Sequence, residues 1–346
     1  MKFKNILTSS FRHFSTVIFF AGFAFDLIML PDFSEVIAKV IGLGHILVVA
    51  TFIIMREWVV SRNRADETEA RVFSFLTFFI SFSSGAALSF VFVYAIRSAD
   101  ILSSWPFFLI LLCCMFVNEF VGTHDFRLML DVGVLFVAIL FYSIFNVPYI
   151  LKTENDFVFG ASVVIAIVAS LIYLRILRKS SETARNESAH GHALAVGIPM
   201  FVAMFYFLNL IPAVPISLKD VGVYHYIEKT DSGDFTLKGY NDKSPLSFLK
   251  VEKYQVLPED TGVYFYSAID APADIKAPIS HTWEFYDTYA KKWISNTRID
   301  FGIIGGRDEG YRAYSKKENI MPGLWRVVIK VGNNRIIGIK KFEVSF

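Results

Sequence analysis

The distribution of apolar residues divides the chain into two parts with different periodicity. Long apolar runs recur up to Pro215 and then stop. A helix of roughly 20 apolar residues can cross a ~30 Å hydrocarbon core, and about seven runs approach this length. We therefore expect a transmembrane helical domain over residues 1–215. The expected spans lie near Ser15–Leu30, Phe33–Met55, Val72–Ile96, Ile101–Val117, Leu128–Leu151, Phe157–Leu177 and Ala193–Ile211.

After Pro215 the pattern changes to short alternating segments separated by Gly, Pro, Asn and Asp. Near the C-terminus, Trp325 and Val327 share one strand face while Arg326 lies on the other. Such two-faced strands are typical of an antiparallel β-sandwich, and ~130 residues suit one Ig-like domain. The predicted fold class is an α-helical membrane bundle followed by an all-β, Ig-like sandwich over residues 216–346. The expected strands are 221–229, 234–240, 262–270, 279–287, 292–304, 310–317 and the hairpin 324–346.

Composition supports a membrane protein and limits the partners. The 346 residues are 54% hydrophobic and include 36 Phe, which is too apolar for a fully solvated chain. The formal net charge is only +2, so the chain is no polycation that would bind nucleic acid. The two cysteines, Cys113 and Cys114, are adjacent in an apolar run and provide neither a disulfide framework nor a zinc site.

The positions of Lys and Arg predict the orientation. Basic residues flank every second loop, whereas the alternate loops contain only Arg97 and Lys152. Since Lys and Arg accumulate in cytoplasmic loops, we expect a cytoplasmic N-terminus and, after an odd number of spans, a periplasmic C-terminal domain at a bacterial inner membrane. A cleaved signal peptide is an alternative interpretation of the first run. The residues expected on the cytoplasmic side are Lys2, Lys4, Arg12, Arg56, Arg62, Arg64, Arg71, Arg127, Arg178, Lys179 and Arg185.

Two charged residues flank the predicted turn between the first two spans. Asp26 precedes Pro31 and Lys39 follows it, so both lie at a similar shallow depth and can pair across the hairpin. Alternatively, Lys39 binds Glu35 one helical turn away while Asp26 faces a polar cavity. Both alternatives stay open.

Polar residues within apolar runs are costly and often functional. Arg127 and Asp131 are four residues apart and are expected to satisfy each other on one helix face. Among these residues, His45 lies nearest the centre of its apolar run. It is expected either to pack with a hydrogen bond or to act in a proton relay. The intramembrane candidates are Asp26, Lys39, His45, Glu119 and Asp131.

No arrangement typical of catalysis is found in the sequence, which lacks a phosphate loop, a nucleophile elbow and a metalloprotease helix. His190 and His192 lie two residues apart in a polar loop and make a poor metal site. The segment GIIGGRDEG, residues 302–310, precedes a strand instead of a helix, so a hairpin connection fits it better than a dinucleotide loop. We therefore expect no enzymatic activity, no metal and no cofactor.

The stretch ISHTW raises the question of a binding site in the β domain. Strand alternation places His281 and Trp283 on the inward face. Ser315 lies on the opposite face of its strand from Arg312 and Lys316, so it is the expected hydrogen-bond partner of a neutral, buried His281. The alternative is that His281 contacts a ligand.

Charge is unevenly distributed in the β domain. Residues 217–287 contain 7 basic and 12 acidic residues, whereas residues 288–346 contain 12 basic and 5 acidic residues. Arg312, Lys316 and Arg326 alternate with inward residues and are the candidate ligand-binding residues on this cationic half. Anionic lipid headgroups, lipopolysaccharide phosphates or an acidic protein would be attracted to them, and a merely solvated face is the alternative.

Two stretches resemble a bacterial inner-membrane family catalogued as domain of unknown function 2914. They are Gly85–Phe120 and the C-terminal segments AIDAPADIKAPISHTWEF, GYRAYSKK and GLWRVVIKV. The resemblance implies a multi-span region plus a C-terminal β domain, and the family has no assigned activity. Thr282 departs from the basic or bulkier residue that the family more often has there. The matching positions are Ser98, Ala99, Asn118, Glu119, His281, Trp283, Arg312, Ser315, Lys316, Gly323, Trp325 and Val327.

The sequence thus predicts a membrane-anchored periplasmic recognition or scaffolding protein. Its expected partners are the lipid bilayer and an anionic envelope ligand or protein, and its oligomeric state is not indicated. The alternative is a transporter or channel-like protein whose β domain gates the pore or docks a partner.

Overall fold

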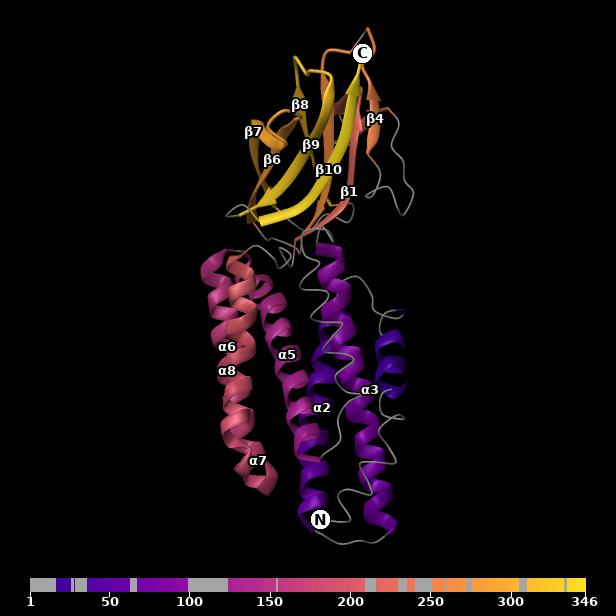
Figure 1. Cartoon of the computed structure of the whole chain (residues 1–346). Coiled ribbons are helices and arrows are strands. Elements are labelled where there is room, and N and C mark those ends of the chain that lie inside the picture. The colour runs from indigo at the N-terminus through magenta and orange to yellow at the C-terminus, as the bar shows by residue number, and fades with distance from the viewer. Residues whose placement is uncertain are drawn as a thin grey trace. The chain divides into compact units, whose positions relative to one another are not determined.

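The helices and strands of the chain separate into two compact units, one helical and one built from strands (Figure 1). The predicted span near 101–117 lies outside the residues that the structure describes. The computed structural model describes residues 17–25, 28, 36–62, 67–98, 124–153, 155–208, 216–229, 235–239, 251–258, 260–271, 276–304, 310–332 and 335–346.

Five helices in the described part are long and apolar enough to cross a membrane. They correspond to five of the seven predicted spans, and residues 17–25 of the predicted first span are also helical. Seven spans are therefore not confirmed. The labelled helices are α2 (Val36–Arg62), α3 (Glu67–Ser98), α5 (His124–Leu151), α6 (Asp156–Ser180), the short α7 (Glu182–Asn186) and α8 (Ser188–Phe207).

Helix α6 shows how these long apolar helices pack. Its buried face contains the small residues Ser162, Ala166 and Ser170 at intervals of four, while apolar residues such as Ile165 and Ile172 are exposed. Small side chains allow helices to approach closely, and an exposed apolar face suits contact with lipid. Ser143 of α5 accordingly donates a hydrogen bond to the backbone oxygen of Ser162 at 3.0 Å.

The helix that includes residues 17–25 crosses α3 at two glycines. A Cβ added to Gly22 would lie 2.0 Å from the backbone oxygen of Phe82, and one added to Gly85 would lie 1.9 Å from that of Phe19. No side chain fits at either position, so the two backbones touch through glycine. This contact makes the first apolar run part of the helical unit.

The β unit contains a three-stranded sheet, a five-stranded sheet and a two-stranded hairpin. The strand orders are β1-β5-β8, β4-β10-β9-β6-β7 and β2-β3. All pairs are antiparallel except β4 with β10, which is parallel. The strands are β1 (Ser217–Tyr224), β2 (Tyr226–Lys229), β3 (Phe235–Lys238), β4 (Glu252–Gln255), β5 (Val263–Asp270), β6 (Lys276–Asp287), β7 (Lys292–Ile304), β8 (Tyr311–Lys317), β9 (Gly323–Val331) and β10 (Arg335–Ser345).

The three- and five-stranded sheets share one apolar core. Phe265 of the smaller sheet packs edge-on against Trp283 of the larger one, and Trp325, Val327 and Phe342 are buried with them. The inward alternation predicted for the last hairpin is therefore confirmed. An Ig-like arrangement is not confirmed.

Two strand predictions need correction. The segment expected as one strand over 221–229 bends at His225, whose backbone N–H donates to the oxygen of Lys238, and it divides into β1 and β2. Strand β4 was not predicted, because its four residues are too short to show an alternating pattern.

Candidate functional site

His281 lies in the core of the β unit and forms hydrogen bonds through both ring nitrogens. Its Nδ1 is 3.0 Å from Ser315 Oγ on β8, and its Nε2 is 2.9 Å from Ser267 Oγ on β5. Trp283 donates its Nε1–H to the same Ser315 Oγ at 3.1 Å. All these side chains are buried, so the cluster connects β6 of the larger sheet to two strands of the smaller one.

The contacts suit a neutral His281 ring. Such a ring donates through one nitrogen and accepts through the other, and the two serine hydroxyls can fill both roles while Ser315 Oγ also accepts the Trp283 N–H. Desolvation by burial lowers the pKa of His281 to about 3, which keeps the ring neutral. The predicted hydrogen bond to Ser315 is present, and these contacts support the interpretation of His281 as a core residue.

Gly323 and Trp325 fix the beginning of β9. Gly323 has φ +129°, and a Cβ there would lie 3.0 Å from the ring of Phe285. The Trp325 ring packs against the same Phe285 ring at 5.1 Å and donates its Nε1–H to the backbone oxygen of Met321 at 2.9 Å. Both positions therefore contribute to packing at this end of the sheet.

The three candidate ligand-binding cations lie on two different sheets. Arg312 and Lys316 are on β8 of the three-stranded sheet, whereas Arg326 is on β9 of the five-stranded sheet. Arg326 Nε donates to Glu284 Oε2 at 2.6 Å, and its guanidinium carbon lies 4.3 Å from the centroid of the Trp293 ring. Arg326 therefore has local partners and does not form one surface with the other two.

Lys316 lies beside the ring of Tyr264 on the three-stranded sheet, and two further tyrosine rings lie close to Tyr264. We call the surface made by Tyr226, Lys238, Tyr264, Tyr314 and Lys316 the tyrosine face. The Tyr264 ring lies 5.9 Å from that of Tyr226 and 6.2 Å from that of Tyr314. Tyr226 and Tyr314 are 41% and 40% exposed, and Lys316 Nζ and Lys238 Nζ lie 5.6 Å and 5.8 Å from the rings of Tyr264 and Tyr226.

Lys316 is charged and half-buried in this arrangement. Its Nζ donates to Glu318 Oε1 at 2.7 Å, and this hydrogen bond raises the pKa of Lys316. The side chain of Lys316 is 29% exposed and that of Glu318 is 66% exposed, and ion pairs near a protein surface contribute little to stability. Beneath the face, Phe235 of β3 packs against Tyr266 and Tyr314, which holds the hairpin on the sheet.

Sequence reasoning missed a histidine–aspartate pair in the β unit. His225 Nδ1 is 2.8 Å from Asp260 Oδ2, which also accepts from the Leu257 backbone N–H at 2.8 Å and from Tyr254 at 3.3 Å. The rings of His225 and Tyr254 lie 4.5 Å apart. Since these residues are far apart in the sequence, only the folding of β4 and its following turn brings them together.

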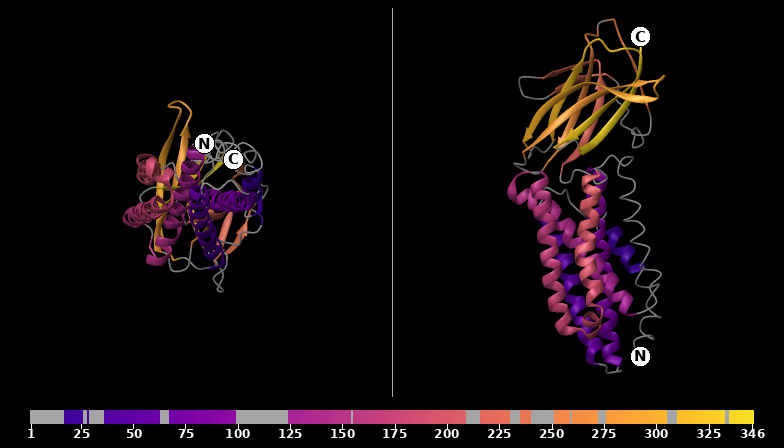
Figure 2. Two further views of the ribbon diagram at one scale, coloured as in Figure 1. Left: turned by 90° about the horizontal axis from the view of Figure 1, so that it is seen from below. Right: turned by 60° about the vertical axis from the view of Figure 1, so that its left-hand side comes forward.

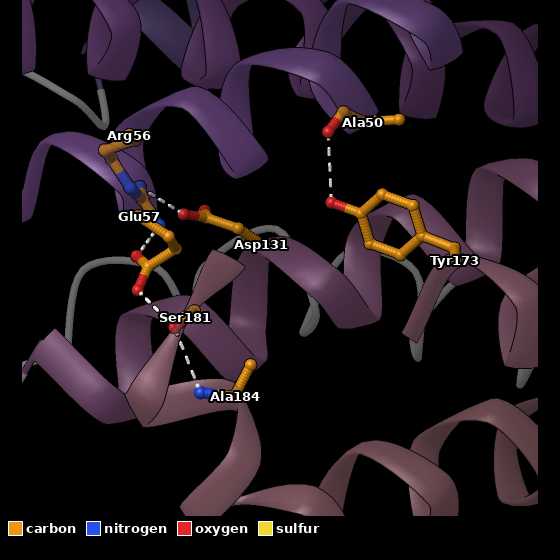
Figure 3. A network of polar contacts seen from close by, with 7 residues as sticks. All are labelled: Ala50, Arg56, Glu57, Asp131, Tyr173, Ser181 and Ala184. Carbon is orange, nitrogen blue, oxygen red and sulfur yellow. Dashed lines mark hydrogen bonds and ion pairs between the residues drawn. The ribbon is translucent and has the colours of Figure 1, made fainter. Parts of the chain in front are cut away.

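A buried ionic network links helices of the helical unit (Figure 3). Arg56 of α2 is 0% exposed, and its Nη1 donates to Asp131 Oδ2 of α5 at 2.6 Å. Its Nη2 lies 3.6 Å from Oε1 of the neighbouring Glu57. Ser181 donates to Glu57 Oε2 at 2.9 Å and accepts the Ala184 N–H at 3.1 Å, which caps α7.

This network adds one unexpected contact and corrects one expectation. Asp131 accepts a hydrogen bond from Arg56 of α2, across the helices, and its expected pairing with Arg127 on its own helix stays a prediction. Arg56 was counted as a loop cation, but α2 continues to Arg62. The adjacent Arg56 and Glu57 within an apolar run were the signal that could have indicated a buried pair.

The other intramembrane candidates are dispersed. Lys39 is buried, and its Nζ lies 2.8 Å from the centroid of the Tyr149 ring of α5, a contact that the sequence did not predict. His45 is half-buried in α2. Asp26 and Glu119 lie outside the described residues, and so does the proposed pairing of Asp26 with Lys39.

The fold and these sites define a class of protein in which several apolar, membrane-compatible helices are followed by an all-β region. Residues 276–344 match the family described as Protein of unknown function (DUF2914). The match confirms the family resemblance in the C-terminal β region, from β6 to β10, and does not extend to Gly85–Phe120.

Other comparisons add no functional information. No curated protein matches the chain. Among solved structures, it is similar to the Pseudomonas fluorescens alkylpurine DNA glycosylase AlkC bound to DNA containing an abasic site analog, at 11% identity, with 91% of this chain and 100% of that chain covered and a TM-score of 0.23. A similarity of this size carries no argument about fold or function.

Proposed function

We propose that the chain is a bacterial inner-membrane protein in which seven helices anchor a periplasmic, Ig-like β-sandwich, and that this domain recognises an anionic envelope ligand. Recognition or scaffolding is proposed, without catalysis. The observation that carries the proposal is the tyrosine face, where Lys238 lies beside the partly exposed Tyr226 ring and Lys316 lies beside the buried Tyr264 ring.

The chemistry of this face suits a phosphorylated saccharide. Tyrosine rings offer flat apolar surfaces and hydroxyl groups, and the lysine ammonium groups offer charge-assisted hydrogen bonds to phosphate. Arg312, on the same outward face of β8, adds a further positive charge near Tyr314. The His281 cluster supports this face from within, because Ser315 lies between Tyr314 and Lys316 and points into the core.

The test uses the full-length protein in detergent and the lipid-free core oligosaccharide of lipopolysaccharide. We expect binding by calorimetry that weakens about tenfold in Tyr314→Ser or Lys316→Gln, since each removes one contact of about 1.4 kcal/mol. Lys341→Gln, at an exposed lysine of β10, is the matched control. Equal binding of the dephosphorylated oligosaccharide, or unchanged binding by both variants, would refute the proposed site.

The buried network around Arg56 favours the alternative of a transporter or channel-like protein, because charges within a membrane are costly and often mark a pathway. Removing residues 216–346 distinguishes the two. Retention of a flux by the remaining helices would support transport, whereas loss of ligand binding without any flux in either form would support recognition.

A further inference from the structure

The strand order places several connections of the β unit at one end. Ser217 pairs with Asp270, so β1 begins at the end where β5 stops. The antiparallel pairs place the turn 288–291 and the connection 318–322 at the opposite end. The turn after β4 lies at that same end, because β4 runs parallel to β10. We call this the distal end, meaning only its position along the strands.

Exposed apolar side chains occur at each of these connections. Leu257, Tyr289 and Met321 are 38%, 99% and 50% exposed. Single exposed apolar residues are ordinary on protein surfaces, but a Tyr without side-chain cover at the tip of a long hairpin is not. Figure 2 shows the hairpin of β6 and β7, in orange, extending beyond the neighbouring strands.

The turn that carries Tyr289 is held in one conformation. Asp287 Oδ1 accepts the backbone N–H of Tyr289 at 2.8 Å and that of Ala290 at 2.9 Å. Lys291 closes the turn with φ +50°. Because the backbone is already ordered, little conformational entropy is lost when the tyrosine side chain enters a binding partner.

Two lysines adjoin this tyrosine without an ion pair among the described residues. Lys291 and Lys292 are both exposed. Other cations of the β unit do have acidic partners, such as Lys316 with Glu318 and Arg326 with Glu284. Asp287, the acidic residue closest in sequence, uses one carboxylate oxygen to hold the turn. The tip therefore presents an aromatic side chain with a local positive charge.

The shape and charge of this tip fit an anionic lipid surface better than a protein. A stable protein interface buries roughly 800 Å² on each partner around a packed centre, which a narrow convex hairpin does not offer. A tyrosine is favourable at the membrane–water boundary, and lysines there are attracted to anionic headgroups.

We propose that the tip formed by Tyr289, Lys291 and Lys292 binds an anionic lipid surface, with Tyr289 entering the headgroup region. This site is separate from the tyrosine face and does not depend on it. Met321 and Leu257, which lie at the same end, can add apolar contact once the tip is bound.

The experiment follows the environment of residue 289 in the full chain. The protein carries Tyr289→Cys with Cys113→Ser and Cys114→Ser, is labelled with an environment-sensitive fluorophore and is held in phosphatidylcholine nanodiscs. Phosphatidylglycerol vesicles should shift the emission to the blue. Adding Lys291→Gln and Lys292→Gln should weaken the vesicle partitioning about tenfold or more. A label at Gly302→Cys, an exposed position near the other end of β7, should not respond.

The outcomes separate lipid binding from other events. No shift with phosphatidylglycerol, or an equal shift with phosphatidylcholine vesicles, would overturn the proposal. A shift caused by envelope proteins but not by vesicles of envelope lipids would assign the tip to a protein partner and also overturn it. Adding Tyr314→Ser should leave the vesicle response unchanged. The test of lipid binding at the tip is therefore independent of whether the tyrosine face binds a saccharide.

Discussion

At the scale of single residues, the polar side chains around His281 are arranged so that each has a partner in the core. Ser315 forms hydrogen bonds with both Trp283 and His281, and Ser267 forms one with the second ring nitrogen of His281. An unpartnered polar group in a core costs about 1–3 kcal/mol, so this cluster constrains how β6, β5 and β8 can pack. The histidine also makes the β unit sensitive to acid.

The first prediction concerns that sensitivity. Burial lowers the pKa of His281 from 6.5 to about 3, so between these values the unfolded chain binds a proton that the folded chain does not. The contribution to stability is complete above pH 6.5 and falls with decreasing pH by at most about 1.4 kcal/mol per pH unit. Thermal unfolding of the full chain in detergent, followed by tryptophan fluorescence from pH 7.5 to 4.5, measures this slope.

A His281→Leu variant provides the comparison. It should be less stable at pH 7.5 but should show a shallower pH dependence, because the titrating ring is gone. His190→Leu, at an exposed histidine of α8, should keep the slope of the unmodified protein. A slope that is the same with and without His281 would contradict the assignment.

The residue contacts also show what a sequence can reveal. Alternation alone placed His281 and Ser315 inward, because strand faces repeat every two residues. It could not identify Ser267 as the second partner or Glu284 as the partner of Arg326, since both contacts depend on which strands are neighbours. The pair of His225 and Asp260 was equally hidden, because it forms through a turn with no periodic pattern.

At the scale of elements, glycine determines how closely the first helix approaches α3. A side chain at Gly85 would overlap the backbone of Phe19, and the same holds for Gly22 and Phe82. Each helix contributes one glycine that lies against the backbone of the other helix, so a shift of either helix would disrupt both glycine contacts. This packing favours a retained span over a cleaved signal peptide for the first apolar run.

Substitution at this crossing gives the second prediction. Gly85→Leu should lower the stability of the full chain in detergent by about 1–3 kcal/mol or more, since overpacking forces the helices apart. Gly160→Leu is the control, because nothing lies within 4 Å of a Cβ at this exposed position of α6. Equal melting temperatures for the two variants would show that the crossing is not tight.

The third prediction concerns the link between α2 and α5. Asp131→Leu should cost about 3–5 kcal/mol by leaving Arg56 buried without this partner, whereas the double variant Arg56→Met with Asp131→Leu should recover much of that loss. Glu67→Gln, in the exposed pair with Arg71, should change stability by less than ~1 kcal/mol. Additive effects of the two substitutions in the network would contradict a coupled pair.

At the scale of the whole molecule, the helices and strands could be predicted from the sequence better than the order of the strands in the sheets. The five described helices that are long and apolar enough to cross a membrane were predicted because hydropathy is a property of consecutive residues. Most strands were predicted because alternation is also such a property. Neither hydropathy nor alternation predicts the order of the strands in a sheet. The parallel pairing of β4 with β10 and the placement of β8 beside β5 join segments that are far apart in the chain, so only the fold reveals them.

The last prediction concerns the side of the membrane on which the β unit lies, and it depends on one helix only. Helix α8 begins after the basic segment that contains Arg178, Lys179 and Arg185, and β1 begins shortly after α8 ends. Since Lys and Arg accumulate in cytoplasmic loops, the segment before α8 is expected in the cytoplasm and the β unit in the periplasm. The helices near the N-terminus do not enter this comparison.

An alkaline phosphatase fusion after Phe346 should therefore be active in a bacterial inner membrane, and a fusion after Arg185 should be inactive. Green fluorescent protein fused at the same positions should give the opposite result, because it does not fold after export in an unfolded form. If both phosphatase fusions were active, α8 would not cross the membrane; if the activities were reversed, the β unit would be cytoplasmic and both proposed binding surfaces would face a different set of ligands.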